Sequence, residues 1–405
     1  MLNDERTIDA NGHAKMTIVL GMLVALLEGV DFQIIGVVAP VLIKTLGFSP
    51  QQIGELFSSS LVGLAIGSLI GGKLADQIGR KPTLVGAILV MGAFTLGAAA
   101  TDNFMSLLVM RFLTGVGLGG ALPNMIALVS EAVHQKRRTF FVAIISCGLA
   151  LGGVIISLLG RFALPELGWR GLFVVGGVLP VLIVPVLAFA LKETRSRNEA
   201  NAVHVGVAAA LFSEQRAVST VSLWIGFALT LFQLSLLLNW LPTLVIAKGL
   251  SAAEAFTALL FVNVGSLVGS SFVGWMCDRY GARWPMALVY TSMMATMVGL
   301  GNATHYSEIL AWSFLAGVVV LGAQFVLYGL APKIYPAESR GFGVGAAAAA
   351  GRIGAIVAPI VAGQMIGAGA TASTILTLMV PLVLCAGLAI FLLSFSARSA
   401  LASEA

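Results

Sequence analysis

The sequence predicts an all-α membrane protein in which twelve transmembrane helices form two six-helix, pseudo-symmetric halves. Its composition is the first reason, because 58% of the 405 residues are hydrophobic and only 10% are charged, whereas a soluble domain carries about 25% charged residues. The mean hydropathy is +0.99. The second reason is a series of apolar runs long enough to span lipid, and the third is an internal repeat.

Twelve apolar runs alternate with short charged or turn-rich segments. Backbone groups left unpaired in hydrocarbon cost several kcal/mol each, so we expect every run to be helical. The first run, residues 16–38, can span a hydrocarbon core of roughly 30 Å and lacks a small-residue cleavage site, so we expect no cleavable signal peptide. The predicted spans centre near Ala25, Gly63, Met91, Gly115, Leu151, Val181, Leu231, Ser266, Thr296, Val319, Ala350 and Val383.

The basic residues predict the orientation in the membrane. One set of loops and tails holds seventeen of the 23 Lys and Arg residues, and the opposite set holds only Lys44, Arg161, Arg170 and Lys248. Loops rich in Lys and Arg stay in the cytoplasm. We therefore expect both termini to be cytoplasmic, in a bacterial inner membrane.

Five residues recur 202 positions later in the chain. Gly72, Asp76, Gly79, Arg138 and Gly152 return as Gly274, Asp278, Gly281, Arg340 and Gly354. The offset is close to half the chain, which is typical of two parallel duplicated halves. We expect an N-terminal half over residues 1–191, a cytoplasmic linker over 192–217 and a C-terminal half over 218–405.

Composition also excludes several function classes. The net charge of +5 is spread over short loops, so we expect no nucleic-acid partner. The three cysteines lie in apolar runs without metal or disulfide spacing, and we expect neither a metal nor a cofactor. A membrane-embedded enzyme would need His, Cys or paired acids gathered at one interface, and the sequence offers no such group.

The loop after the second run, GGKLADQIGRKP, carries a distinctive pattern, and the loop GWMCDRYGAR is its partial copy. Ordinary cytoplasmic loop charge explains Arg80 and Lys81 but not the repeated Gly-x3-Asp-x2-Gly spacing. We expect Gly72 to let two helices approach and Asp76 to end a helix. The pattern resembles the signature motif of the major facilitator superfamily, in which this cluster latches the cytoplasmic side. The resemblance implies a gating role for Gly72, Asp76, Gly79, Arg80, Lys81, Asp278 and Arg279, although Gln77 replaces the usual arginine.

Four charged residues fall inside predicted spans: Glu28, Asp31, Arg111 and Arg352. A charge at bilayer depth costs at least ~2.5–3.5 kcal/mol and usually marks function. At 1.5 Å per residue, Asp31 lies ~9 Å below the outer surface and Arg111 within about 10–14 Å of it, so the two can lie at comparable depth. Glu28 and Asp31 share one helical face.

Two interpretations of these charges stay open. A buried ion pair could serve only to order the helix packing. Alternatively, Glu28, which has no nearby cation in the sequence, could carry a proton, because a desolvated carboxyl without a partner favours its protonated form. The second interpretation predicts proton coupling through Glu28, Asp31 and Arg111.

Five segments resemble the aromatic acid:proton symporter family: LLEGVDFQIIGVVAP, RFLTGVGLGGALPNMIALVSEA, LLLNWLP, AQFVLYGLAP and VGAAAAAGRIGA. Members carry an acidic pair in the first helix and arginines in the fourth and eleventh, which match Glu28, Asp31, Arg111 and Arg352. One departure is Glu28, where many members have Asp. The fifth span lacks the Gly-Pro pair of drug–proton antiporters, which argues against drug efflux.

The resemblance implies a monomeric proton-coupled symporter, surrounded by membrane lipids, that imports a hydroxyphenylpropionate- or hydroxybenzoate-like carboxylate by alternating access. Arg352 is our candidate for the carboxylate, because its guanidinium is a planar bidentate fork. Asn239, Gln324 and Tyr328 lie in spans that line the cavity in this fold, although they could equally form hydrogen bonds between helices. The alternatives are a major facilitator exporter of a drug or other metabolite, and a sensor without flux.

Overall fold

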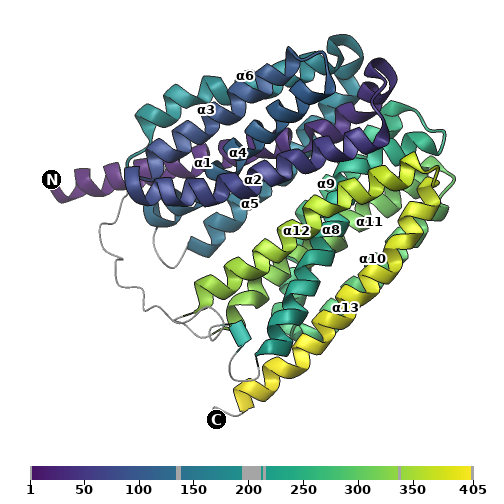
Figure 1. Ribbon diagram of the computed structural model, residues 1–405. Helices are drawn as coiled ribbons and strands as arrows, with labels where there is room; N and C mark the ends of the chain where they lie inside the picture. Colours follow the sequence, from purple (N-terminus) through teal and green to yellow (C-terminus); the bar gives the residue numbers. More distant parts are fainter. Residues whose placement is uncertain (1, 134–137, 194–210, 213–215, 336–338, 403–405) are drawn as a thin grey trace. The chain divides into compact units, whose positions relative to one another are not determined.

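The computed structural model describes residues 2–133, 138–193, 211–212, 216–335 and 339–402. The chain forms two compact units, Met1–Asn198 and Glu199–Ala405 (Figure 1). The described residues are almost entirely helical and include no β-strand. Most of the predicted linker, and the predicted cytoplasmic residues Lys136, Arg137, Arg195 and Arg197, lie outside the described residues.

The first unit contains six long helices: α1 (Leu2–Leu46), α2 (Pro50–Ile78), α3 (Arg80–Ala99), α4 (Phe104–Ala132), α5 (Arg138–Phe162) and α6 (Leu164–Ala190). Helix α4 packs against α2 and α3, α1 packs against α5, and α3 packs against α6. Helix α1 also contacts α4 and α6. These contacts bring α1 and α4, which carry the predicted charges of this unit, against each other.

The second unit repeats the arrangement with α8 (Ala217–Ala247), α9 (Ala252–Tyr280), α10 (Arg283–Asn302), α11 (Tyr306–Leu330), α12 (Arg340–Gly367) and α13 (Ala372–Ala402). A short 3₁₀ turn, Ala331–Lys333, follows α11. Helix α11 packs against α9 and α10, α8 against α12, and α10 against α13. Each pair is the counterpart of one in the first unit.

Every predicted span centre falls in a different long helix, so the twelve-helix fold class is confirmed. Within the described residues, eleven helices are long and apolar enough to cross a membrane. Helix α10 is the twelfth. Its 20 residues are long enough, since 1.5 Å per residue gives about 30 Å, but Arg283, Thr291, Ser292 and Thr296 lower its hydropathy.

Matching caps begin the second helix of each unit. The Ser49 hydroxyl accepts a hydrogen bond from the Gln52 backbone N–H (3.2 Å), and Gln52 Oε1 accepts one from the Ser49 N–H (2.9 Å). Ser251 and Glu254, each 202 positions later, form the same capping box. Because this reciprocal pair satisfies two backbone donors that a helix start leaves open, α2 and α9 begin at equivalent residues.

Glycines make equivalent close approaches in both units. A Cβ atom at Gly63 would collide with the carbonyl oxygen of Phe112, and one at Gly265 would collide with that of Phe314. Gly152 against Leu26 corresponds in the same way to Gly354 against Ala228. Small residues let helix backbones approach where lipid supplies no hydrophobic drive. The 202-residue repeat is therefore a repeat of helix packing as well as of sequence.

Candidate functional site

The first unit buries an ion pair between α1 and α4. Arg111 Nη1 donates to Asp31 Oδ1 at 2.6 Å, and the two side chains are 1% and 0% exposed. Arg111 Nη2 also donates to the backbone carbonyl of Asp31 at 3.2 Å. The depth estimate from the sequence put both residues at one level, and the structure joins them directly.

Further polar side chains complete the surroundings of this pair. Thr95 on α3 donates to Asp31 Oδ2 at 2.8 Å, and the Thr95 hydroxyl lies 3.4 Å from that of Thr114 on α4. Arg111 Nε donates to the Ser60 hydroxyl on α2 at 3.2 Å. The guanidinium carbon lies 5.9 Å from the centre of the Phe173 ring on α6. Five helices of the unit thus meet at one buried pair of charges.

Sequence reasoning missed Ser60, Thr95, Thr114 and Phe173 as parts of this network. Hydroxyl residues are common in transmembrane helices because they can bond to their own backbone, so their presence alone is weak evidence. The sequence did carry one signal for Thr114. It lies three residues from Arg111 and therefore on the same side of α4.

Glu28 lies one turn before Asp31 on α1 and is 4% exposed. Its Oε1 has no hydrogen-bond partner among the described residues. The Asp31 carboxylate acts on it electrostatically, and the backbone of Leu122 on α4 interacts with it. Among the described residues, this part of the unit therefore holds two buried carboxyl groups and one buried arginine.

In the second unit Arg352 and Tyr328 interact. The half-buried Arg352 side chain on α12 acts electrostatically on the Tyr328 hydroxyl on α11. The Tyr328 ring packs edge-on against Phe227 of α8, with ring centres 5.0 Å apart. A cation near Tyr328, whose ring in turn contacts Phe227, offers a partner for a carboxylate and an apolar wall. Phe227 was missed, because one phenylalanine in an apolar run carries no signal of its own.

Asn239 and Gln324 differ in burial, because Asn239 is buried and Gln324 is only half-buried. Asn239 is 3% exposed, and its Nδ2 donates to the carbonyl and the hydroxyl of Ser235 at 2.8 and 3.2 Å. The Ser235 hydroxyl donates in turn to the Ala355 carbonyl on α12 at 2.8 Å. Asn239 thus takes part in the hydrogen bonding between α8 and α12. Gln324 is half-buried and lies one turn before Tyr328 on α11.

The predicted gating motif is tied to its neighbours by charge. Arg80 forms an ion pair with Glu131 near the end of α4. The Glu193 carboxylate, just after α6, accepts hydrogen bonds from the backbone N–H groups of Arg80 (3.0 Å) and Lys81 (3.1 Å). An acid at a helix N-terminus satisfies open donors and complements the helix dipole. Glu193 therefore holds the start of α3 against the end of α6.

One expectation for this motif is wrong. Among the described residues, nothing lies within 4 Å of where a Cβ at Gly72 would be, so Gly72 does not bring two helices of the first unit together. Its neighbour Gly71 has that role, with the backbone of Gly120 at 2.7 Å from such an atom. The two glycines are adjacent and point to different sides of α2, so a one-residue difference changes the face. Gly79, with φ of 105°, ends α2 in a conformation that suits glycine.

The partial copy in the second unit keeps the turn but not the ion pair. Gly281 has φ of 75°, and the exposed Asp278 and Arg279 precede it. The Arg279 guanidinium lies 5.8 Å from the centre of the Tyr280 ring. The positions that correspond to Arg80 and Glu131 hold Ala282 and Lys333, which cannot form the pair.

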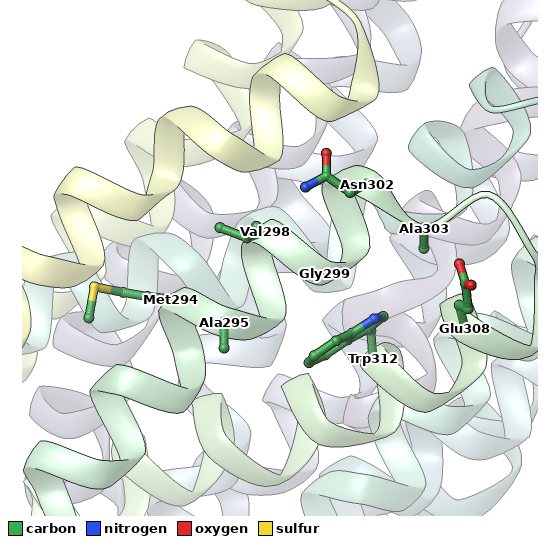
Figure 2. A pocket seen from close by; sticks show the side chains of 8 residues that line it. All are labelled: Met294, Ala295, Val298, Gly299, Asn302, Ala303, Glu308 and Trp312. Atoms are coloured by element: carbon green, nitrogen blue, oxygen red, sulfur yellow. The ribbon is translucent and has the colours of Figure 1, made fainter.

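Figure 2 shows an open groove between the end of α10 and the start of α11, with a volume of about 560 Å³. No predicted site residue lines it. Its acid, Glu308, already accepts hydrogen bonds from the backbone N–H groups of Thr304 and His305 at 3.1 and 3.4 Å. The groove is lined by Met294, Ala295, Val298, Gly299, Asn302, Ala303, Glu308 and Trp312. With its acid used as a helix cap, we assign it no part in the site.

Curated relatives cover almost the whole chain. It is 37% identical over 382 residues to the 3-(3-hydroxy-phenyl)propionate transporter of Escherichia coli K12, covering 93% of each chain. It is 34% identical to the 4-hydroxybenzoate transporter PcaK of Pseudomonas putida (90% of this chain, 89% of that one). It is also 31% identical to the gallate transporter of Pseudomonas putida (93% and 90%).

Solved structures match the fold at lower identity. A D-xylose-proton symporter superposes with a TM-score of 0.73 at 18% identity, over 92% of this chain and 96% of that one. The nucleoside transporter NupG superposes with a TM-score of 0.78 at 14% identity, over 94% and 99%. The Major Facilitator Superfamily profile matches residues 21–301 and 262–404. The chain therefore belongs to the major facilitator superfamily and is a multi-pass membrane transporter.

Proposed function

We propose that this transporter is a proton-coupled symporter that imports an aromatic carboxylate across the bacterial inner membrane by alternating access. The names of its relatives support the substrate class, since these are transporters of 3-(3-hydroxyphenyl)propionate, 4-hydroxybenzoate and gallate. Both termini are cytoplasmic in this proposal, as the basic loops favour. The protein works as a monomer among membrane lipids, with a linker over residues 192–217 between its halves.

The observation that carries proton coupling is the imbalance of buried charge in the first unit. Asp31 is already paired with Arg111 at 2.6 Å, while Glu28 Oε1 has no hydrogen-bond partner among the described residues. A buried charge needs a partner or a proton. In this proposal Glu28 binds and releases a proton, Asp31 takes part in the relay, and Arg111 controls when Asp31 is free to do so.

The carboxylate of the substrate binds Arg352. The guanidinium provides two parallel N–H donors that match a carboxylate, and it lies beside Tyr328, whose ring contacts Phe227. An aryl ring needs such an apolar wall. Gln324, one turn from Tyr328, offers an amide to a ring hydroxyl, and Asn239 supports the site through its bonds to Ser235.

The gating role of the cytoplasmic motif belongs to the same proposal. The Arg80–Glu131 ion pair and the Glu193 cap hold the ends of α3, α4 and α6 together. The group of residues that we propose to act in gating also includes Gly72, Asp76 and Lys81, together with Asp278 and Arg279 of the partial copy. Rigid ends would let the first unit move as one body when access alternates.

Uptake into membrane vesicles tests the proposal. Right-side-out vesicles that contain the protein should accumulate radiolabelled 3-(3-hydroxyphenyl)propionate or 4-hydroxybenzoate when the outside is made acidic, and a proton ionophore should abolish the accumulation. Vesicles without the protein provide the baseline. A major facilitator exporter of a drug or other metabolite would instead show energised uptake only in inverted vesicles.

A further inference from the structure

The repeat gives the buried ion pair a counterpart in the second unit. Asp31 on α1 corresponds to Gln233 on α8, and Arg111 on α4 corresponds to Ser313 on α11, each 202 positions later. The 202-residue correspondence also holds in the helix contacts at this depth. A Cβ atom at Gly115 would collide with the carbonyl oxygen of Ser60, and one at Gly317 would collide with that of Val262.

Both counterpart side chains are uncharged, and their polar atoms have no hydrogen-bond partner in the described part of the chain. Gln233 and Ser313 are each 0% exposed. Neither Nε2 nor Oε1 of Gln233, nor Oγ of Ser313, has a hydrogen-bond partner among the described residues. The hydroxyls that support the ion pair in the first unit, Thr95 and Thr114, correspond to Met297 and Ala316, which cannot replace them.

Such a group of unpartnered polar atoms is costly. Each buried donor or acceptor left open loses its hydrogen bonds to water without replacement, and an amide together with a hydroxyl leaves three polar atoms to satisfy. Serine is much shorter than the arginine at the corresponding position, so its hydroxyl cannot reach as far from its helix as the guanidinium does. Buried water typically makes about three hydrogen bonds to groups of this kind.

We propose that Gln233 and Ser313 form a closed, uncharged polar site that holds water in the core of the second unit. Gln233 can donate through Nε2 and accept through Oε1, and Ser313 can do both. A water molecule between them would link α8 to α11, which pack together, as the ion pair links α1 to α4. The proposal stands on the geometry of this unit and does not depend on the transported substrate.

The proposed water site also bears on the number of transported protons. This one step rests on the proton coupling proposed above. Neither an amide nor a hydroxyl titrates in the physiological range, so this site keeps the same charge throughout. The site itself would then bind no transported proton. Replacing Gln233 with Leu should leave the number of protons per substrate unchanged.

Radiolytic hydroxyl labelling with rapid mixing into H₂¹⁸O detects slowly exchanging water in the purified, full-length protein. We expect residues around the site, Met297 among them, to incorporate ¹⁸O later than exposed methionines do. The double variant Gln233→Leu, Ser313→Ala should lose this delayed label. Thr296→Val is the matched control, because the Thr296 hydroxyl already donates to the Met293 carbonyl in its own helix at 2.7 Å, and this variant should keep the delayed label.

A high-resolution density map of the unmodified protein gives an answer that does not depend on any variant folding. We expect density within hydrogen-bond distance of both Gln233 and Ser313. A direct amide–hydroxyl bond, or a Ser313 hydroxyl turned onto the backbone of its own helix with no density beside Gln233, would overturn the proposal. Failure of the symport proposal would show only in transport assays and would leave this result untouched.

Discussion

Asp31 and Arg111 neutralise each other in a place where neither charge could be left alone. Their contact at 2.6 Å, with almost no exposure, means that the loss of one partner leaves an uncompensated buried charge, which typically costs about 3–5 kcal/mol. Under the proposed mechanism, a change at this pair would therefore affect both transport and stability. A useful variant must separate the effect on transport from the effect on stability.

Replacing Asp31 with Asn should abolish uphill uptake, because the proposed relay loses a carboxylate. Counter-flow exchange, which needs no net proton movement, should survive better. The single variant should also melt at a lower temperature, since Arg111 is left unpaired. We expect the neutral double variant Asp31→Asn, Arg111→Gln to recover much of the thermal stability but not the uphill uptake. Recovery of both would mean that the pair only orders the helix packing.

At Arg352, a change to Lys keeps the charge but removes the planar fork. Affinity for the aromatic acid should fall tenfold or more, which corresponds to about 1.4 kcal/mol, while the matching amide should lose far less. Binding to purified protein measures both ligands. Arg161→Lys is the control and should change neither affinity, because the Arg161 guanidinium lies 5.4 Å from the centre of the Phe162 ring and has no part in the proposed site. Equal weakening of acid and amide would make Arg352 structural and move the anion site to Arg111.

The residues that could be identified from the sequence were those whose charge costs free energy inside the membrane. A charge in lipid is expensive wherever it lies, so Asp31, Arg111 and Arg352 could be singled out before any contact was known. Thr95, Ser60 and Phe227 carry no such cost, and their roles depend on which helices meet. Contact between helices is a property of the fold, and this explains why the hydrogen-bond network and the aromatic pair were not predicted.

At the scale of helices, the spans were predictable because lipid imposes both helical structure and length. Helix α10 is the weakest case, since its polar residues reduce the apolar signal to below that of the other described spans. Which face of a helix makes the close contacts was harder to predict. Gly71 and Gly72 adjoin in the sequence, and only the packing of α2 against α4 shows that Gly71 makes the close approach.

The glycine contacts between helices lead to a paired stability prediction. Gly63→Ala and Gly265→Ala should each lower the melting temperature, because the added methyl group meets a carbonyl of the facing helix in both units, and overpacking typically costs about 1–3 kcal/mol. Gly86→Ala is the control, since nothing lies within 4 Å of its Cβ position. Thermal unfolding in detergent measures all three variants. A Gly63→Ala protein as stable as the control would contradict the close approach.

For the whole molecule, the number of protons decides whether transport senses the membrane potential. One proton with a monovalent carboxylate carries no net charge, whereas two protons carry one positive charge inward, worth roughly 2.3 kcal/mol per 100 mV. In the proposed cycle Asp31 stays coupled to Arg111 for only part of the time, and Glu28 exchanges a proton separately, so we expect more than one proton. Proteoliposomes at equal pH, with a potassium–valinomycin potential negative inside, should therefore show faster uptake. No stimulation would exclude the two-proton scheme.

Substrate-driven proton movement tests the coupling itself most directly. Proteoliposomes with a pH-sensitive dye inside receive 3-(3-hydroxyphenyl)propionate or 4-hydroxybenzoate outside, with equal pH on both sides and potassium–valinomycin clamping the potential at zero. We predict that the interior acidifies as the substrate enters, and that the neutral double variant Asp31→Asn, Arg111→Gln abolishes this change. Substrate entry without acidification of the interior would contradict proton-coupled import.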